Sequence, residues 1–206
     1  MMPCPPQKEF YNMEVAIVKY NAGNVESVQN ALNRLGVKSV VTDDHDVLRS
    51  ADRVIFPGVG HAQPAMEYLI GRQLDRLIIS LVQPVLGICL GMQLMCNSSE
   101  EANTKCLGIF DTEVKLFNSE SLKVPQVGWN DISHLKTNLF RGLQENSYVY
   151  YVHSYYVTLA ADTIAQTSYI LPYTASLGKD NFYGVQFHPE KSGSTGEKIL
   201  ANFLEQ

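Results

Sequence analysis

The chain has 206 residues, of which 45% are hydrophobic and 18% charged, so it is long and apolar enough to bury one sizeable core. Its net charge of −5, with Lys and Arg scattered along the chain, argues against a nucleic-acid partner. No apolar run approaches the ~18 residues of a membrane span, so we also expect no membrane association.

The four cysteines show neither a C-x-x-C pair nor a zinc-like Cys/His grouping, so we expect no metal and no cofactor. A reactive thiol, which the segment around Cys89 indicates, needs a reducing compartment, and we therefore expect a cytoplasmic protein. Residues 1–12 lack the apolar centre of a signal peptide. We predict that they form a short, flexible, Pro-rich extension and that residues 13–206 form a single domain.

In the first half of the chain, apolar runs alternate with segments of helical periodicity, which predicts a parallel sheet covered by helices on both faces. After the first strand we expect a turn at 21–24. The strands are predicted at 15–18, 37–41, 54–56 and 85–88, and the helices at 27–35, at 65–81 and from residue 92 onward. In such sheets, sites lie at the carboxyl ends of the strands.

The second half of the chain contains more strands than helices, which predicts a mixed or antiparallel extension of the sheet. Strands are expected at 108–117, 149–157, 164–168, 175–177 and 182–187, and a closing helix at 199–204. The predicted fold is therefore α/β: an open, flavodoxin-like sheet with a parallel core.

Cys89 lies between Gly87 and Gly91, at the end of an apolar strand and before a helix-like segment. This is the cysteine form of a nucleophile elbow, in which the nucleophile occupies a strained strand-to-helix turn and its close neighbours at ±2 need no side chain. The helix N-terminus would favour the thiolate over the thiol. The alternative is a small buried hydrophobe at a tight turn.

His188 and Glu190 follow a strand of apolar and aromatic residues. In an extended chain, residues i and i+2 face the same side, so both side chains would project together. A thiol nucleophile needs a base, and the base needs a group that orients it. Cys89, His188 and Glu190 supply these three roles, although a solvated strand end is the alternative for the His and Glu alone.

The loop at 57–60 follows a strand end and, in a thiol acyl-transfer enzyme, would bring a backbone N–H to the substrate carbonyl. The N–H of Leu90 is the expected second donor of this oxyanion hole. A plain turn is the alternative for the loop. We interpret His153 as structural, Ser154 and Tyr155 as candidates for lining a polar pocket, and Trp129 as a surface or interface residue in a loop.

With the cysteine elbow and the His-Pro-Glu segment in this order, residues 13–206 resemble class I glutamine amidotransferases. The segments 57–60, 124–130 and 152–156 narrow the resemblance to the glutaminase subunits of imidazole glycerol phosphate synthases. The resemblance implies that Cys89 attacks the side-chain amide of L-glutamine, that His188 moves protons and that Glu190 orients it. It also implies a heterodimer in which ammonia passes to a cyclase subunit with a (β/α)8 barrel.

The resemblance extends to binding positions. It implies an oxyanion hole formed by the backbone N–H groups of Val59 and Leu90. Residues implied to hold glutamine are Gly58, Gly60, Gln93, Glu101, Ser154 and Tyr155. Positions implied to lie at or near the cyclase interface are Asn24, Trp129, Tyr150 and Lys191.

The chain departs from the pattern of the family at five positions that all lie outside the triad: Lys19, Asn21, Ala22, Gln126 and Val127. They bear on contacts with the partner. Two alternatives stay open within enzymes, namely the glutaminase of another class I amidotransferase and a Cys-dependent hydrolase of the same fold. A non-catalytic binding subunit is a third alternative, against which the intact triad argues.

Overall fold

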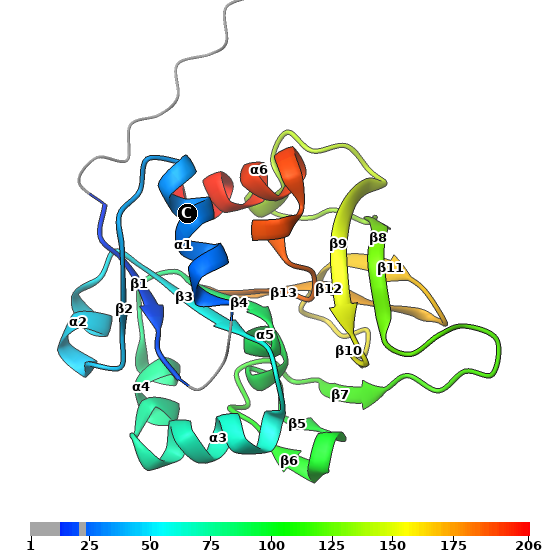
Figure 1. The fold of residues 1–206 in the computed structure, drawn as a ribbon, viewed down its shortest axis with the longest axis horizontal. Coiled ribbons are helices and arrows are strands. Elements are labelled where there is room, and N and C mark those ends of the chain that lie inside the picture. The colour runs from blue at the N-terminus through cyan, green and yellow to red at the C-terminus, as the bar shows by residue number, and fades with distance from the viewer. Residues whose placement is uncertain (1–12, 21–23) are drawn as a thin grey trace, which may run out of the picture.

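The computed structural model describes residues 13–20 and 24–206. The sheet has a parallel half, in which five strands lie in the order β2, β1, β3, β4 and β13 (Figure 1). These strands are β1 (Val15–Val18), β2 (Ser39–Thr42), β3 (Arg53–Gly58), β4 (Val85–Cys89) and β13 (Phe182–Val185). The parallel core predicted from the first half of the chain is thus confirmed, with β13 from the second half as its last member.

Beyond β13 the sheet becomes mixed, as predicted, because β12 pairs with β13 in antiparallel orientation. The sheet continues through β10, β7, β5 and β6, and β11 pairs with β12 off this path. Their bounds are β5 (Ser98–Ser99), β6 (Thr104–Lys105), β7 (Glu113–Leu116), β10 (Tyr155–Val157), β11 (Thr163–Ser168) and β12 (Pro172–Lys179).

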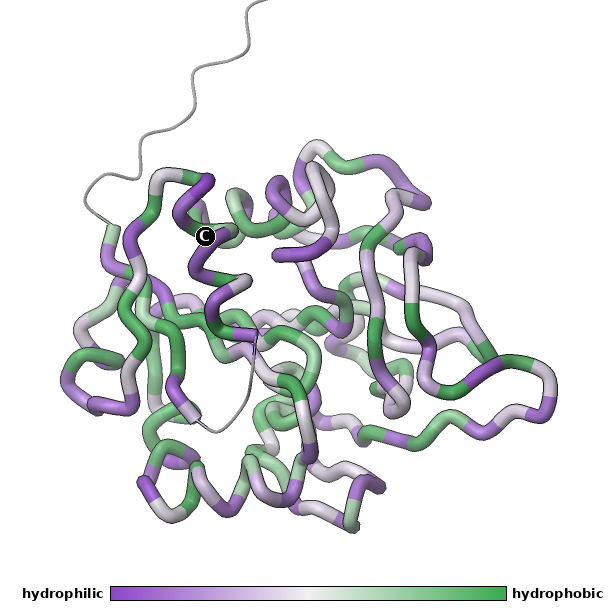
Figure 2. The backbone as a smooth tube through the Cα atoms, in the orientation of Figure 1, coloured by the Kyte–Doolittle hydropathy of each residue, from purple (hydrophilic) through white to green (hydrophobic). Residues whose placement is uncertain are grey.

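Helices cover both faces of the sheet (Figure 1). One face carries α1 (Val25–Arg34) and α6 (Gly193–Leu204), and the other carries α3 (Ala62–Gly71), α4 (Leu74–Ser80) and α5 (Leu90–Leu94). Alternate residues of β1 serve the two faces, since Val15 and Ile17 pack with α1 and α6 while Ala16 and Val18 pack with α3 and α4. Buried on both sides, the central strands are almost continuously apolar (Figure 2).

A separate pair of antiparallel strands, β8 (Gln126–Ile132) and β9 (Ser147–His153), stands beside the end of the main sheet (Figure 1). Our prediction of one strand over 149–157 was wrong, because the chain leaves this pair at Ser154 and enters the main sheet as β10. The prediction of a loop around Trp129 was also wrong, since Trp129 lies within β8, paired with Tyr150.

The single helix predicted over 65–81 is in fact two helices, separated at Gln73, whose φ is 58°. The break has a physical reason. A continuous helix with Met66 and Leu69 on its buried face would bring Gln73 and Arg76 onto that same face. Restarting the helix at Leu74 places Leu74, Leu77 and Ile78 in the core instead.

Smaller differences concern the ends of elements. Of the strand expected at 108–117, only Glu113–Leu116 forms, because Gly108 has a φ of 70° and the chain turns before it extends. The closing helix begins six residues earlier than predicted, at Gly193. The helix α2 (His45–Ser50), capped by Asp44, was not predicted. Three short 3-10 helices complete the structure: η1 (Glu101–Asn103), η2 (Asn138–Phe140) and η3 (Pro189–Lys191).

The predicted extension at residues 1–12 lies outside the described residues, as do Asn21 and Ala22 and most of the turn predicted at 21–24. Within the part of the chain that the structure describes, no helix has the length and apolarity needed to cross a membrane.

Candidate active site

Cys89 is the last residue of β4 and directly precedes α5, in the strained turn expected of a nucleophile elbow. Its φ of 52° and ψ of −109° are rare for a residue with a side chain. The flanking glycines are required by contact. A Cβ on Gly91 would lie 1.8 Å from the carbonyl oxygen of Phe56, and one on Gly87 would lie 2.8 Å from the backbone N of Met92. The strand, the turn and the helix therefore fit together only with glycine at both positions.

His188 and Glu190 form a buried pair, with Nδ1 of His188 2.8 Å from Oε1 of Glu190. The parallel register of β13 and β4 places Val185 beside Ile88, which brings the segment after β13 next to Cys89. Our expectation that Glu190 continues an extended strand was wrong, because Glu190 lies in η3. The turn of this short helix folds the carboxylate back onto the His188 ring.

The environment of His188 favours its protonated form. Burial lowers the pKa of His188, but the charge of Cys89 and a hydrogen bond with it, together with the hydrogen bond and charge of Glu190, outweigh burial and raise the pKa from 6.5 to about 10. Nε2 is buried and has no partner at normal hydrogen-bond geometry among the described residues. One ring nitrogen is thus held by Glu190 while the other is left for Cys89 chemistry, as a thiolate–imidazolium pair requires.

A cavity of about 330 Å³ opens over Cys89. It is large enough for an amino acid, and segments far apart in the sequence form its wall. Most of the predicted binding residues meet here: the lining includes Val59, Gly60, Cys89, Leu90, Gln93, Glu101, Ser154 and Tyr155, together with His61, Pro125, Val152 and His153. Gly58 is not in the lining; it is buried at the end of β3, in register with Cys89.

The predicted oxyanion donors lie at neighbouring strand ends. Val59 follows β3 and Leu90 follows β4, and the parallel register pairs Gly58 with Cys89. As the first residue of α5, Leu90 has a backbone N–H without a partner inside the helix. Both residues line the cavity, so their backbone can face the carbonyl of a molecule bound against the sulfur.

Glu101 supplies a fixed negative charge on the cavity wall. Its Oε2 accepts a hydrogen bond from the backbone N of Ala62 at 2.7 Å, and its Oε1 lies 3.0 Å from Nδ1 of His61. The carboxylate is buried and oriented by the start of α3. Such a group can hold the ammonium of a bound amino acid.

Comparison with known proteins now decides the family. The model of "Glutamine amidotransferase class-I" matches residues 16–206. The chain belongs to the class I glutamine amidotransferases. It is 59% identical over 195 residues to the imidazole glycerol phosphate synthase subunit HisH of Bacteroides fragilis, covering 94% of this chain and all of the relative. The HisH subunits of Bacteroides thetaiotaomicron and Escherichia coli are 56% and 47% identical, with the same coverage.

Solved structures agree on the amidotransferase fold. A crystal structure of a GMP synthase component from Thermoplasma acidophilum has a TM-score of 0.73 and 22% identity, covering 94% of this chain and 92% of that one. PurLQS from Thermotoga maritima has a TM-score of 0.66 and 16% identity, covering 94% and 98%. At such identities the likeness concerns the fold alone.

The four predicted interface residues of this amidotransferase lie close to the triad. Asn24 donates a hydrogen bond from Nδ2 to Oε1 of Glu190. The backbone O of Tyr150 accepts from the backbone N of His188 at 2.9 Å, and the ring of Tyr150 meets that of Trp129 edge-on with centroids 6.0 Å apart. Lys191 is exposed in η3 and donates its backbone N–H to the His188 carbonyl. Asn24 thus contacts the triad directly, which the sequence did not indicate.

Two further residues of the site were not predicted to take part in it. Gln186 contacts the Cys89 sulfur through its side-chain amide. His153 was predicted to be structural, and it is buried with Nδ1 2.8 Å from the Tyr155 carbonyl oxygen and Nε2 3.2 Å from the Tyr173 hydroxyl. Burial lowers its pKa to about 4, the Tyr155 carbonyl acts in the opposite direction, and the charge of His188 lowers it further. Although it lines the cavity, His153 is therefore neutral at pH 7.

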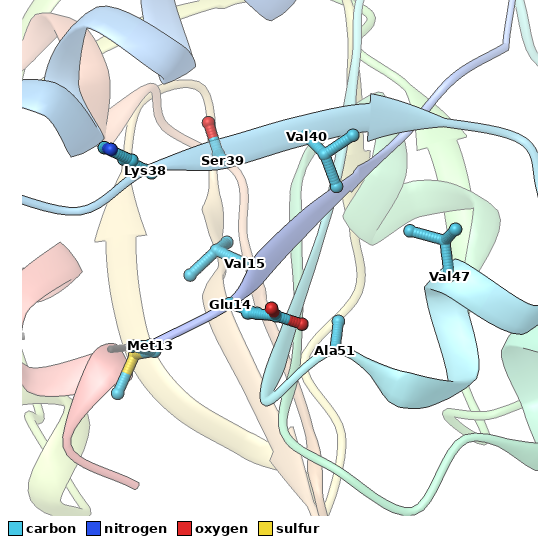
Figure 3. Close-up of a pocket in the computed structure, with 8 residues that line it drawn as sticks. All are labelled: Met13, Glu14, Val15, Lys38, Ser39, Val40, Val47 and Ala51. Carbon is cyan, nitrogen blue, oxygen red and sulfur yellow. The ribbon is translucent and has the colours of Figure 1, made fainter. Parts of the chain in front are cut away.

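A larger cavity of about 570 Å³ lies elsewhere, between the starts of β1 and β2 and the helix α2 (Figure 3). It is lined by Met13, Glu14, Val15, Lys38, Ser39, Val40, Val47 and Ala51. This is the amino end of the parallel strands, opposite the carboxyl ends that carry Cys89. None of the predicted site residues lines it, so its size does not make it the amidotransferase site.

Proposed function

We propose that this chain is the glutaminase subunit of an imidazole glycerol phosphate synthase. It hydrolyses L-glutamine to glutamate and ammonia and passes the ammonia to a cyclase subunit. There, ammonia reacts with a phosphorylated ribulosyl aminoimidazole carboxamide intermediate to give imidazole glycerol phosphate and an aminoimidazole carboxamide ribotide in histidine biosynthesis. The observation that carries the proposal is the strained Cys89 beneath a 330 Å³ cavity, beside a buried His188–Glu190 pair.

In the first half of the reaction, the Cys89 thiolate attacks the side-chain amide carbon of glutamine. The carbonyl oxygen becomes an oxyanion, which the backbone N–H groups of Val59 and Leu90 stabilise. The His188 imidazolium gives its proton to the leaving nitrogen, and the C–N bond breaks. Ammonia departs and a glutamyl thioester remains on the sulfur.

In the second half, neutral His188 takes a proton from water, and the resulting hydroxide attacks the thioester carbon. The C–S bond breaks, releasing glutamate, the Cys89 thiolate and the His188 imidazolium. Glu190 holds Nδ1 of the ring throughout, so that Nε2 faces the reacting atoms. Glutamine and water are thereby converted to glutamate and ammonia, and no cofactor is needed.

Substrate binding follows from charge and shape. Glu101 would take the α-ammonium of glutamine, while Gly60, Gln93, Ser154 and Tyr155 close the cavity around its backbone atoms and side chain. Gly58 contributes by leaving the floor open, since a Cβ at this position would lie 2.0 Å from the Tyr20 hydroxyl. A thiolate of this kind works in the reducing cytosol, where we place the reaction.

The partner surface is the open face of the β8–β9 pair. Val127, Trp129 and Tyr148 are 55–59% exposed there, an unusual density of large apolar side chains for a free surface. Val152 on the same face also lines the glutamine cavity, so the face continues into the site. A cyclase subunit with a (β/α)8 barrel seated on Trp129, Tyr150, Lys191 and the neighbourhood of Asn24 would form a heterodimer directly behind His188.

A diazoketone analogue of glutamine tests the chemistry of the site. The intact chain, mixed with its cyclase partner, should be alkylated at Cys89 alone, and excess glutamine should protect it. The Cys89→Ala variant should lose glutamine hydrolysis while still binding the partner. Full hydrolysis by Cys89→Ala, or labelling without protection by glutamine, would overturn the proposal.

A further inference from the structure

The fully buried Gln186 side chain lies between the nucleophile and the glutamine cavity. Its Nε2 donates a hydrogen bond to Sγ of Cys89, at 3.6 Å, and its Oε1 accepts one from Nε2 of Gln93, at 2.9 Å. The same Nε2 of Gln93 donates its other hydrogen to the Tyr155 carbonyl oxygen, also at 2.9 Å. Two amides thus connect the wall of the cavity to the reactive sulfur.

The direction of this chain of hydrogen bonds is fixed at its outer end. A backbone carbonyl can only accept, so Gln93 must present its NH₂ group to Tyr155. The second hydrogen of that NH₂ group then requires the oxygen of Gln186. This leaves the NH₂ group of Gln186 facing the sulfur, so the usual ambiguity of an amide orientation does not arise here.

The two polar neighbours of Cys89 favour opposite protonation states of the sulfur. The Val152 carbonyl oxygen, 3.9 Å away, can accept a hydrogen bond from a thiol but repels a thiolate. The Gln186 N–H points its positive end at the sulfur and is stronger when the acceptor is charged. Because Gln186 is neutral, it supports the thiolate without competing with the imidazolium of His188.

We propose that Gln186 is a further catalytic residue, which stabilises the Cys89 thiolate by an N–H donor and holds the sulfur facing the cavity. The proposal rests on the proposed function, since it assigns Gln186 a part in glutamine hydrolysis. It also explains why a long, fully buried amide stands at this position: a shorter side chain would not span from Gln93 to the sulfur, and a carboxylate would repel it.

The experiment uses Gln186→Glu and Gln186→Met, with Gln63→Glu on the surface of α3 as the matched control. Gln186→Glu keeps the shape and the oxygen that accepts from Gln93, but it lacks the donor toward the sulfur. Gln186→Met lacks both polar atoms and adds no charge. Each variant is first compared with the parent by thermal melting, and the rate of iodoacetamide alkylation of the Cys89 peptide is then followed by mass spectrometry from pH 5 to 10. Steady-state glutamine hydrolysis is measured with the cyclase partner present.

The proposal predicts that both Gln186 variants shift the alkylation midpoint upward by about one pH unit, equivalent to about tenfold slower alkylation at a pH below the midpoint. It also predicts that kcat falls about tenfold or more, while KM in Gln186→Glu stays within about twofold because Gln93 keeps its acceptor. Alkylation midpoints that match the parent in both folded variants would overturn it. This readout needs no glutamine turnover, so it can fail or succeed independently of the Cys89→Ala test.

Discussion

At the scale of single residues, the site depends on pairs of groups that set each other's charge. His188 is buried and would be neutral alone, yet Cys89 and Glu190 raise its pKa to about 10. His153, also buried beside the cavity, has no anionic partner among the described residues that shifts it upward, and its pKa falls to about 4. Two histidines in one site thus differ in charge at pH 7 because of their neighbours, which is what separates the proton donor from the structural residue.

Glu190→Gln should lower the pKa of His188, because the variant removes the negative charge next to Nδ1 while keeping a hydrogen-bond acceptor. Loss of the imidazolium at high pH limits ammonia departure, so the alkaline limb of the pH profile of kcat should move down by about one unit or more. The profile is measured from pH 6 to 10 with the cyclase partner present. An alkaline limb at the parental position would show that Glu190 does not set the charge of His188; Glu67→Gln on α3 is the control.

His153 makes stability depend on pH in a predictable direction. Its folded pKa lies below the unfolded value of 6.5, so its contribution is present above pH 6.5 and is lost as pH falls toward 4. Relative to His153→Gln, the parent should lose about 2 kcal/mol of unfolding free energy between pH 7.5 and 5. His188, with a raised pKa, has the opposite dependence but is present in both proteins. Urea unfolding at the two pH values checks this, and equal losses would contradict it.

At the scale of elements, the elbow joins β3, β4 and α5 at a distance that only glycine permits. Gly91→Ala would place a methyl group 1.8 Å from the Phe56 carbonyl oxygen, so β3 and α5 would have to separate. We expect a Tm lower by about 5 °C or more, together with loss of glutaminase activity. Gly71→Ala is the matched control, because a Cβ there meets nothing within 4 Å. Similar melting of the two variants would refute the packing account.

The sequence predicted the elements whose pattern is local, and it missed those fixed by distant contacts. The central strands and the Cys89 turn follow from continuous apolar runs and flanking glycines. The break at Gln73 depends on which helix face meets the sheet, and the break at Ser154 depends on a second strand pair, β8–β9. Likewise His188 and Glu190 were paired correctly, but the approach of Asn24 and of Gln186 comes from elements far apart in the chain.

At the scale of the whole molecule, the glutamine cavity and the exposed β8–β9 face lie back to back with the His188 segment between them. The Tyr150 backbone bonds to His188, and the Tyr150 ring contacts Trp129. A partner that moves this strand pair would therefore move the segment that carries the base. The arrangement suits a glutaminase whose activity depends on a cyclase subunit.

Trp129→Ala should weaken cyclase binding about tenfold or more, or reduce activation of glutamine hydrolysis by a similar factor, because it removes a large apolar side chain that is 55% exposed. Its Tm should stay within about 2 °C of the parent, since surface substitutions have small effects on stability. Val40→Ala, on the opposite side of the molecule in β2, is the matched control (Figure 1). Binding is measured by titration calorimetry, and unchanged binding and activation would remove Trp129 from the interface.

Glutamine hydrolysis with and without the partner tests the central claim most directly. The chain is assayed alone, with the cyclase barrel of a Bacteroides imidazole glycerol phosphate synthase, and with that barrel plus its ribulosyl aminoimidazole carboxamide substrate. We predict slow release of glutamate by the chain alone and a rise of about a hundredfold or more, on the order of 3 kcal/mol in activation free energy, only in the complete mixture. A high rate by the chain alone, unchanged by the barrel and its substrate, would contradict the assignment to a partner-dependent glutaminase.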